Sequence, residues 1–88
     1  MKHAKLMNVK LYSTLTCPYC KMEKAWLDEK KVNHDVIYVD LNPKEAEKMV
    51  AKTGQIGVPV TEIQYENENP VYVIGFDTGK LSQLLGVS

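Results

Sequence analysis

Four short runs of apolar and β-branched residues lie along the chain, at residues 9–12, 35–40, 60–64 and 71–74. Runs of this length, bounded by polar or turn-forming residues, predict β-strands. The second run holds branched and aromatic residues in succession, which indicates a strand buried on both faces, as in a parallel sheet. The polar segment that separates the last two runs ends in Pro70 and predicts a hairpin loop.

Three other stretches show the period of amphipathic helices. The first runs from about residue 19 to residue 30. We expect its core-facing stripe to comprise Met22, Ala25 and Trp26, widened by Cys20 and Leu27. The lysines near its end suit the negative pole of a helix.

The ends of the other two helices carry recognisable signals. Asn42 is placed to cap the second helix, Pro43 suits its first position, and Gly54 predicts its end. Asp77 is placed to cap the third helix, and Gly86 follows its last apolar residues. The second and third helices are therefore expected near residues 43–53 and 78–85.

The resulting order is β-α-β-α-β-β-α, an α/β fold with a four-stranded mixed sheet and three flanking helices. The N-terminal strand–helix–strand unit supplies a right-handed parallel half, and the C-terminal hairpin supplies an antiparallel half. A chain of 88 residues forms one domain, here residues 1–88. We expect residues 1–7 to be a flexible lead-in.

Composition excludes several classes of partner. Hydrophobic residues make up 44% of the chain, and eleven basic residues balance eleven acidic ones. There is therefore no electrostatic case for binding nucleic acid or an anionic membrane. No apolar run is long enough to span a bilayer, and the first residues lack the apolar core of a signal peptide. We expect a cytoplasmic monomer.

The chain has two cysteines, Cys17 and Cys20, which lie between the first predicted strand and the first predicted helix. A helix N-terminus presents unpaired N–H groups and about half a positive charge, and both favour a thiolate over a thiol. We therefore expect a lowered pKa for Cys17, because Cys-x-x-Cys thiols in this setting titrate at roughly 3.5 to 7.5. Pro18 suits the first helical position. This places Cys17 as the nucleophile and Cys20 as the resolving thiol.

The cysteine pair has three alternative roles, as core residues, as a structural disulfide or as metal ligands. The spacing of the pair directly after a strand argues against two ordinary core residues. A purely structural disulfide is also disfavoured, because a bridge that closes so short a loop constrains the unfolded chain little. Zinc requires four ligands, for which the chain offers the two cysteines, His3 and His34. We expect no metal site within one chain, although a site shared between two chains stays open.

Three segments resemble the glutaredoxin family. The motif Cys17-Pro18-Tyr19-Cys20 is that of dithiol glutaredoxins. Residues 53–60 resemble the family's helix end, turn and cis-proline strand, and residues 74–77 resemble its glycine–aspartate turn. The similarity covers most of the chain and is greatest to short prokaryotic glutaredoxin-like proteins and NrdH-type redoxins. It implies a thioredoxin-like fold and a thiol–disulfide oxidoreductase.

The resemblance also implies a substrate groove, formed by Tyr19, Val58, Pro59, Gly75, Phe76 and Asp77. Pro59 is expected to be cis and to pack against the disulfide. The backbone of Val58 is expected to pair with the substrate peptide as a short added strand. Asp77 is expected to pair with the γ-glutamyl end of glutathione, although a plain helix cap is an equal alternative for it.

The chain departs from the family where glutathione is expected to bind. Thr14 stands where a lysine or arginine is usual, Gln55 replaces another basic residue, and Gly57 replaces a threonine. The family's turn has two glycines and two aspartates in succession, whereas this chain has Ile74-Gly75 and Asp77-Thr78 at these positions. Lys10, Lys21 and Lys24 are candidates for compensating charges, and the alternative for all three is a solvated surface lysine.

These observations predict an oxidoreductase of glutaredoxin type that reduces protein disulfides or glutathione mixed disulfides and binds no cofactor. Glutathione is the expected co-substrate. The alternative is an NrdH-like carrier that is reduced by thioredoxin reductase. A dimer that holds an iron–sulfur cluster and a protein-interaction domain with idle cysteines are the remaining hypotheses.

Overall fold

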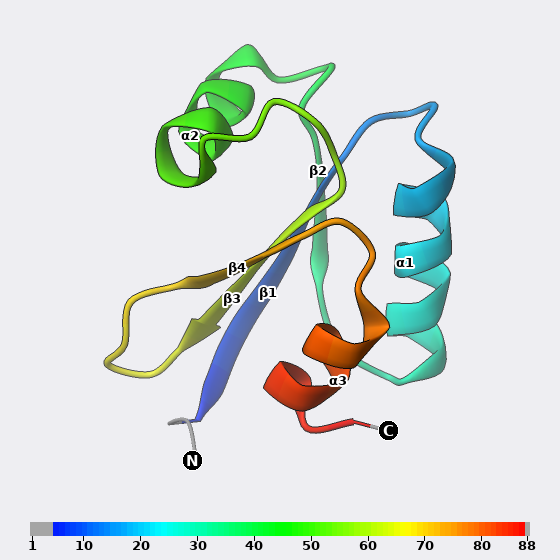
Figure 1. The fold of residues 1–88 in the computed structure, drawn as a ribbon, viewed down its shortest axis with the longest axis vertical. Helices are drawn as coiled ribbons and strands as arrows, with labels where there is room; N and C mark the ends of the chain where they lie inside the picture. Colours follow the sequence, from blue (N-terminus) through cyan, green and yellow to red (C-terminus); the bar gives the residue numbers. More distant parts are fainter. Residues whose placement is uncertain (1–4, 88) are drawn as a thin grey trace.

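The computed structural model describes residues 5–87, and its elements follow one another in the predicted order (Figure 1). They are β1 (Leu6–Ser13), α1 (Pro18–Glu29), β2 (Asp35–Tyr38), α2 (Pro43–Thr53), β3 (Val60–Tyr65), β4 (Val71–Ile74) and α3 (Thr78–Leu85). Within this part of the chain, no helix has the length and apolarity needed to cross a bilayer.

The four strands of residues 5–87 form one mixed sheet in the order β2-β1-β3-β4. β1 runs parallel to β2 and antiparallel to β3, and β3 and β4 form the hairpin. Helix α2 covers one face of the sheet, and α1 and α3 cover the other (Figure 1). The predicted parallel and antiparallel halves are confirmed.

The side chains of β3 alternate between two hydrophobic clusters. Ile63 and Tyr65 belong to the cluster beneath α1 and α3, which also contains Val73, Leu81, Trp26 and Phe76. Val60 belongs to the cluster beneath α2, which also contains Tyr12 and Met49. Thr61 therefore faces α1 and Glu62 faces α2.

Two predictions about the strands are wrong. β1 begins at Leu6 rather than at residue 9, so Leu6 and Met7 belong to the sheet and not to a lead-in. Residues 1–4 lie outside the described residues. β2 ends at Tyr38 and is half-buried rather than buried on both faces, because it lies at the edge of the sheet and pairs with β1 alone.

The predicted buried stripe of α1 is also wrong in part. The buried residues of this helix are Cys20, Glu23 and Leu27. Met22 is 52% exposed and Ala25 is exposed, whereas Trp26 is half-buried as expected. The buried face of α1 was predicted wrongly because Glu23 is charged, and a carboxylate ordinarily lies on the solvent-exposed face of a helix.

The helix ends agree with the sequence except at one cap. Pro43 is the first residue of α2, and Gly54 ends that helix in the left-handed region with φ 71°. The Oδ1 atom of Asp77 accepts the Lys80 N–H at 3.1 Å and caps α3. At Asn42 the expected side-chain cap is absent, since the described residues give it no such hydrogen bond.

Candidate active site

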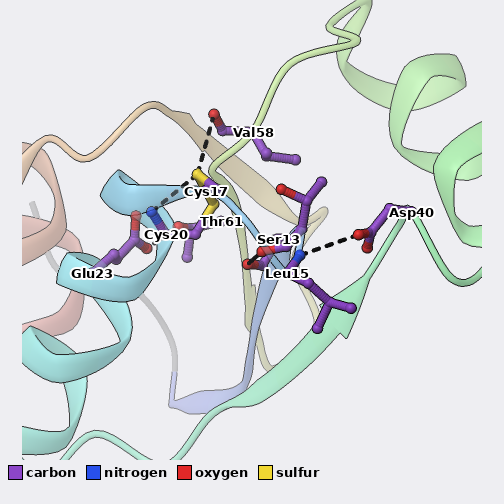
Figure 2. Close-up of a disulfide and its surroundings, with 9 residues drawn as sticks. Ser13, Leu15, Cys17, Cys20, Glu23, Asp40, Val58 and Thr61 are labelled. Carbon is purple, nitrogen blue, oxygen red and sulfur yellow. Dashed lines mark hydrogen bonds between the residues drawn. A yellow bond between two sulfur atoms is a disulfide. The ribbon is translucent and has the colours of Figure 1, made fainter.

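The cysteine pair lies where β1 leads into α1 (Figure 2). Cys17 is the N-cap residue of α1, and Pro18 is at the start of the helix. The two cysteines form a disulfide with their Cα atoms 5.2 Å apart. Cys17 is half-buried, whereas Cys20 is 1% exposed. Only the first cysteine is therefore accessible to a large substrate.

A backbone hydrogen bond distinguishes the two sulfur atoms. The Sγ atom of Cys17 accepts the N–H of Cys20 at 3.1 Å. This donor is one of the N–H groups that a helix N-terminus leaves without an intrahelical partner. In the reduced protein the same contact favours a thiolate at Cys17.

The loop before Cys17 is tied to the end of β2. The N–H of Leu15 donates to Oδ2 of Asp40 at 3.2 Å, and the Oγ atom of Ser13 donates to the carbonyl of Thr14 at 3.0 Å (Figure 2). Sequence reasoning missed Asp40. The available signal was its position directly after a strand parallel to β1, because such strands end at the same edge of a sheet.

The loop that precedes β3 lies against the disulfide. The Val58-Pro59 peptide bond is cis, as the resemblance implied. The Sγ atom of Cys17 is 4.0 Å from the carbonyl oxygen of Val58 (Figure 2). The N–H of Gly75 donates to the carbonyl of Pro59 at 2.9 Å. The structure thus places Val58 beside Cys17 and joins Gly75 to Pro59, the residue that follows Val58.

The other three residues assigned to the groove have different surroundings. Tyr19 is 62% exposed, two residues after Cys17. Phe76 packs edge-on against Trp26, with ring centroids 6.3 Å apart, so its ring takes part in the core. Asp77 caps α3. Within residues 5–87 no hydrogen bond joins these three side chains to the cysteines.

Glu23 is a buried acid that sequence reasoning did not select. It lies one turn after Cys20, and its Oε2 atom accepts a hydrogen bond from the hydroxyl of Thr61 (Figure 2). Burial raises the pKa of Glu23 to about 7, although the Thr61 hydrogen bond lowers it in part. The sequence pattern that could have indicated its burial is spacing, because Cys20, Glu23 and Leu27 occupy positions i, i+3 and i+7 of one helix.

The lysines that were expected to compensate for Thr14 are only partly available. Lys10 lies 3.8 Å from a carboxylate oxygen of Glu62, and Lys24 pairs with Asp28 at 3.0 Å. Lys21 and Lys24 both line a cavity of about 250 Å³, which Cys20 also lines. Because Lys24 is paired with Asp28, Lys21 is the better placed of the two to act near the active site.

The side chains near the cysteine pair do not form a cluster of metal ligands within residues 5–87. Among residues 5–87, no group of three or more histidine, cysteine, aspartate and glutamate side chains is placed to hold a metal ion.

Comparison with known proteins identifies the family. The family model described as Glutaredoxin matches residues 9–66, which is more than half of the chain. The chain belongs to the glutaredoxin family. With its cysteine pair, it is a glutaredoxin-type dithiol–disulfide oxidoreductase.

Relatives and solved structures agree with this assignment. A glutaredoxin-like 8.6 kDa protein of Clostridium pasteurianum is 34% identical over 88% of this chain and 96% of its own. The glutaredoxin-like protein NrdH of Lactococcus lactis is 40% identical over 48% of this chain and 58% of its own. The glutaredoxin structure from Archaeoglobus fulgidus has a TM-score of 0.73 at 29% identity, covering 89% of this chain and 85% of that one. The predicted thioredoxin-like fold is confirmed.

Proposed function

We propose that the protein reduces disulfides in other proteins and glutathione mixed disulfides through Cys17 and Cys20. The observation that carries this proposal is the asymmetry of the pair. Cys17 accepts a helix N-terminal N–H and is partly exposed, whereas Cys20 is buried behind it. The first sulfur is therefore suited to attack and the second to resolution.

The proposed reaction is thiol–disulfide exchange in two steps. The Cys17 thiolate attacks one sulfur of the substrate, the substrate S–S bond breaks, and the second substrate sulfur leaves as a thiolate. Cys20 then loses its proton and attacks the Cys17 sulfur of the mixed disulfide, which releases the remaining substrate thiolate. Two electrons pass from the dithiol to the substrate, and the protein is left as the Cys17–Cys20 disulfide.

The groove residues have proposed roles in holding the substrate. Val58 offers backbone hydrogen-bonding groups within reach of the Cys17 sulfur, which supports pairing with an extended substrate chain. We assign contacts along the same groove to Tyr19, Pro59, Gly75, Phe76 and Asp77. The hydrogen bond between Gly75 and Pro59 supports this grouping, because it fixes one side of the groove against the other.

The proposed source of electrons is glutathione, in a reducing compartment such as the cytoplasm. Thioredoxin reductase is the second candidate. It is favoured by the uncharged side chains of Thr14 and Gln55, and by the sequence similarity to an NrdH protein. With this donor, the exposed apolar residues Leu15 and Tyr19 are proposed to contact the reductase.

The test is consumption of NADPH with a disulfide substrate in two coupled systems. One contains glutathione and glutathione reductase, and the other contains thioredoxin reductase. Turnover with glutathione alone supports the first donor, and turnover with the reductase alone supports the second. A Cys17→Ser variant serves as the control and should be inactive in both systems. Wild-type protein that is inactive in both contradicts the proposed function.

The iron–sulfur hypothesis is tested separately. Protein purified without oxygen in the presence of glutathione should be colourless and monomeric if the cysteine pair serves exchange alone. A coloured dimer would assign Cys17 to a shared cluster instead.

A further inference from the structure

Glu23 shares the buried face of α1 with Cys20, the proposed resolving cysteine. It is 0% exposed and lies three residues after Cys20 on α1, which puts both side chains on one face of the helix. Figure 2 shows Glu23 on the turn of α1 that follows Cys20, with Thr61 of β3 beside it. Its Oε1 atom has no hydrogen-bond partner among the described residues.

Packing alone gives no reason for a carboxyl group at this position. A buried carboxyl with an unpaired oxygen destabilises the folded state, and an apolar side chain would fill the site at less cost. Among residues 5–87 no ion pair involves Glu23, so charge pairing does not account for it either. What Glu23 has is one uncommitted oxygen, on a buried side chain that follows Cys20 by three residues on the same helix.

We propose that Glu23 accepts the proton of the Cys20 thiol when Cys20 attacks the mixed disulfide on Cys17. The proton moves from the Cys20 sulfur to the Glu23 carboxylate, directly or through one water, and the sulfur becomes the attacking thiolate. When a reductant later opens the Cys17–Cys20 disulfide, Glu23 returns the proton to the departing Cys20 sulfur. This role rests on the proposed function, because it concerns the second step of that reaction.

The protonation behaviour of Glu23 suits this exchange. Its raised pKa of about 7 makes both the acid and the carboxylate accessible near neutral pH. Proton transfer is most effective when the pKa of the acceptor is near the working pH. An ordinary exposed glutamate would be a much weaker base.

Other titratable side chains share this side of the sheet. They include Cys17, Lys21, Lys24, Tyr38, Tyr65 and Asp77, besides the exposed residues Tyr19, Asp28, Glu29 and Lys80 of the two helices. Lys24 pairs with Asp28, and Asp77 caps α3. The Tyr65 hydroxyl donates to the Leu84 carbonyl. Lys21 and Tyr38 line the cavity beside Cys20. Glu23 is the carboxyl group that follows Cys20 on the same buried helix face.

The test separates the two steps with the chromogenic disulfide dithiobis(nitrobenzoate). Reduced protein releases a first coloured thiolate when Cys17 attacks and a second when Cys20 resolves, and a Cys20→Ser variant identifies the first phase. In Glu23→Gln the second phase should slow by about 100-fold at neutral pH, which is typical for loss of a general base. The first phase should stay unchanged.

The pH dependence distinguishes proton transfer from a structural effect. The wild-type second phase should level off above about pH 7, whereas that of Glu23→Gln should keep rising as Cys20 ionises unaided. Glu29→Gln, at the exposed end of the same helix, should match the wild type in both phases. A Glu23→Gln second phase with the wild-type rate, or one slowed equally at every pH, overturns the inference. Loss of the first phase in the wild type overturns the proposed function instead.

Discussion

The hydroxyl of Thr61 donates a hydrogen bond to Oε2 of Glu23, which joins the central strand β3 to the active-site helix α1. The two residues are 38 positions apart in the sequence. Thr61 follows Val60 and the cis Pro59, and Glu23 follows Cys20 by one turn. One buried contact therefore links the strand that follows the cis-proline bond to the helix that carries Cys20 and has Cys17 as its N-cap residue.

The buried carboxyl should make stability depend on pH. In the folded state the pKa of Glu23 rises from its ordinary 4.5 to about 7, so folding favours the protonated form. The free energy of unfolding should fall by about 3 kcal/mol as the pH rises between these values, because the unfolded chain ionises first. Glu23→Gln should lack this fall and be the more stable protein above pH 7. Urea unfolding of both proteins across this pH range measures the free energy of unfolding. The same pH dependence in wild type and Glu23→Gln would be evidence against a buried acid.

Loss of the Thr61 hydroxyl should change both the pKa of Glu23 and the stability of the folded protein. In Thr61→Val, both oxygens of Glu23 lack a donor, and the pKa of Glu23 should rise further because the hydrogen bond lowers it. Stability should fall by about 1 to 3 kcal/mol at neutral pH. A double-mutant cycle with Glu23→Leu measures the coupling directly. A coupling energy near zero would show that the two side chains do not interact.

Much of the fold could be predicted because its signals are local. Short branched runs indicated the four strands, and Pro43, Gly54 and Asp77 marked helix ends through their own backbone preferences and hydrogen bonds. The cysteine pair was predictable for the same reason, since its chemistry depends on the helix that begins at Pro18.

The errors arose where an outcome depends on distant residues. Burial of Glu23 rather than Met22 depends on Thr61, which a local helical pattern cannot contain. The partial exposure of β2 follows from its place at the sheet edge, which is a property of strand order. The contact between Asp40 and the loop at Leu15 depends on the parallel pairing of β2 with β1.

The asymmetry of the cysteine pair predicts selective alkylation. When the reduced protein is treated with iodoacetamide at mildly acidic pH, Cys17 should be labelled first, since only a thiolate reacts and Cys20 is buried. Peptide mapping by mass spectrometry identifies the site. In Cys17→Ser the remaining thiol should react far more slowly. Preferential labelling of Cys20 would reverse the assigned roles.

Two substitutions separate the possible roles of Asp77. Asp77→Ala removes the cap of α3 and should destabilise the protein by about 1 kcal/mol, whereas Asp77→Asn should retain the cap. If the carboxylate pairs with the ammonium of glutathione, both variants should raise the KM for glutathione by about tenfold. Steady-state kinetics and thermal unfolding provide the two measurements. An unchanged KM in Asp77→Asn would assign Asp77 to capping alone.

Placing a cation at position 14 should increase the use of glutathione. Thr14 is half-buried, and its carbonyl accepts the Cys17 N–H at 3.4 Å. The backbone of a lysine at this position would therefore lie close to Cys17. Thr14→Lys should lower the KM for glutathione by about fivefold, equivalent to about 1 kcal/mol, and the gain should shrink at high salt. Thr16→Lys adds the same charge at an exposed position of the same loop and serves as the control. Equal gains in both variants would attribute the effect to net charge, and a gain in neither would favour a groove that does not bind the glutathione carboxylate.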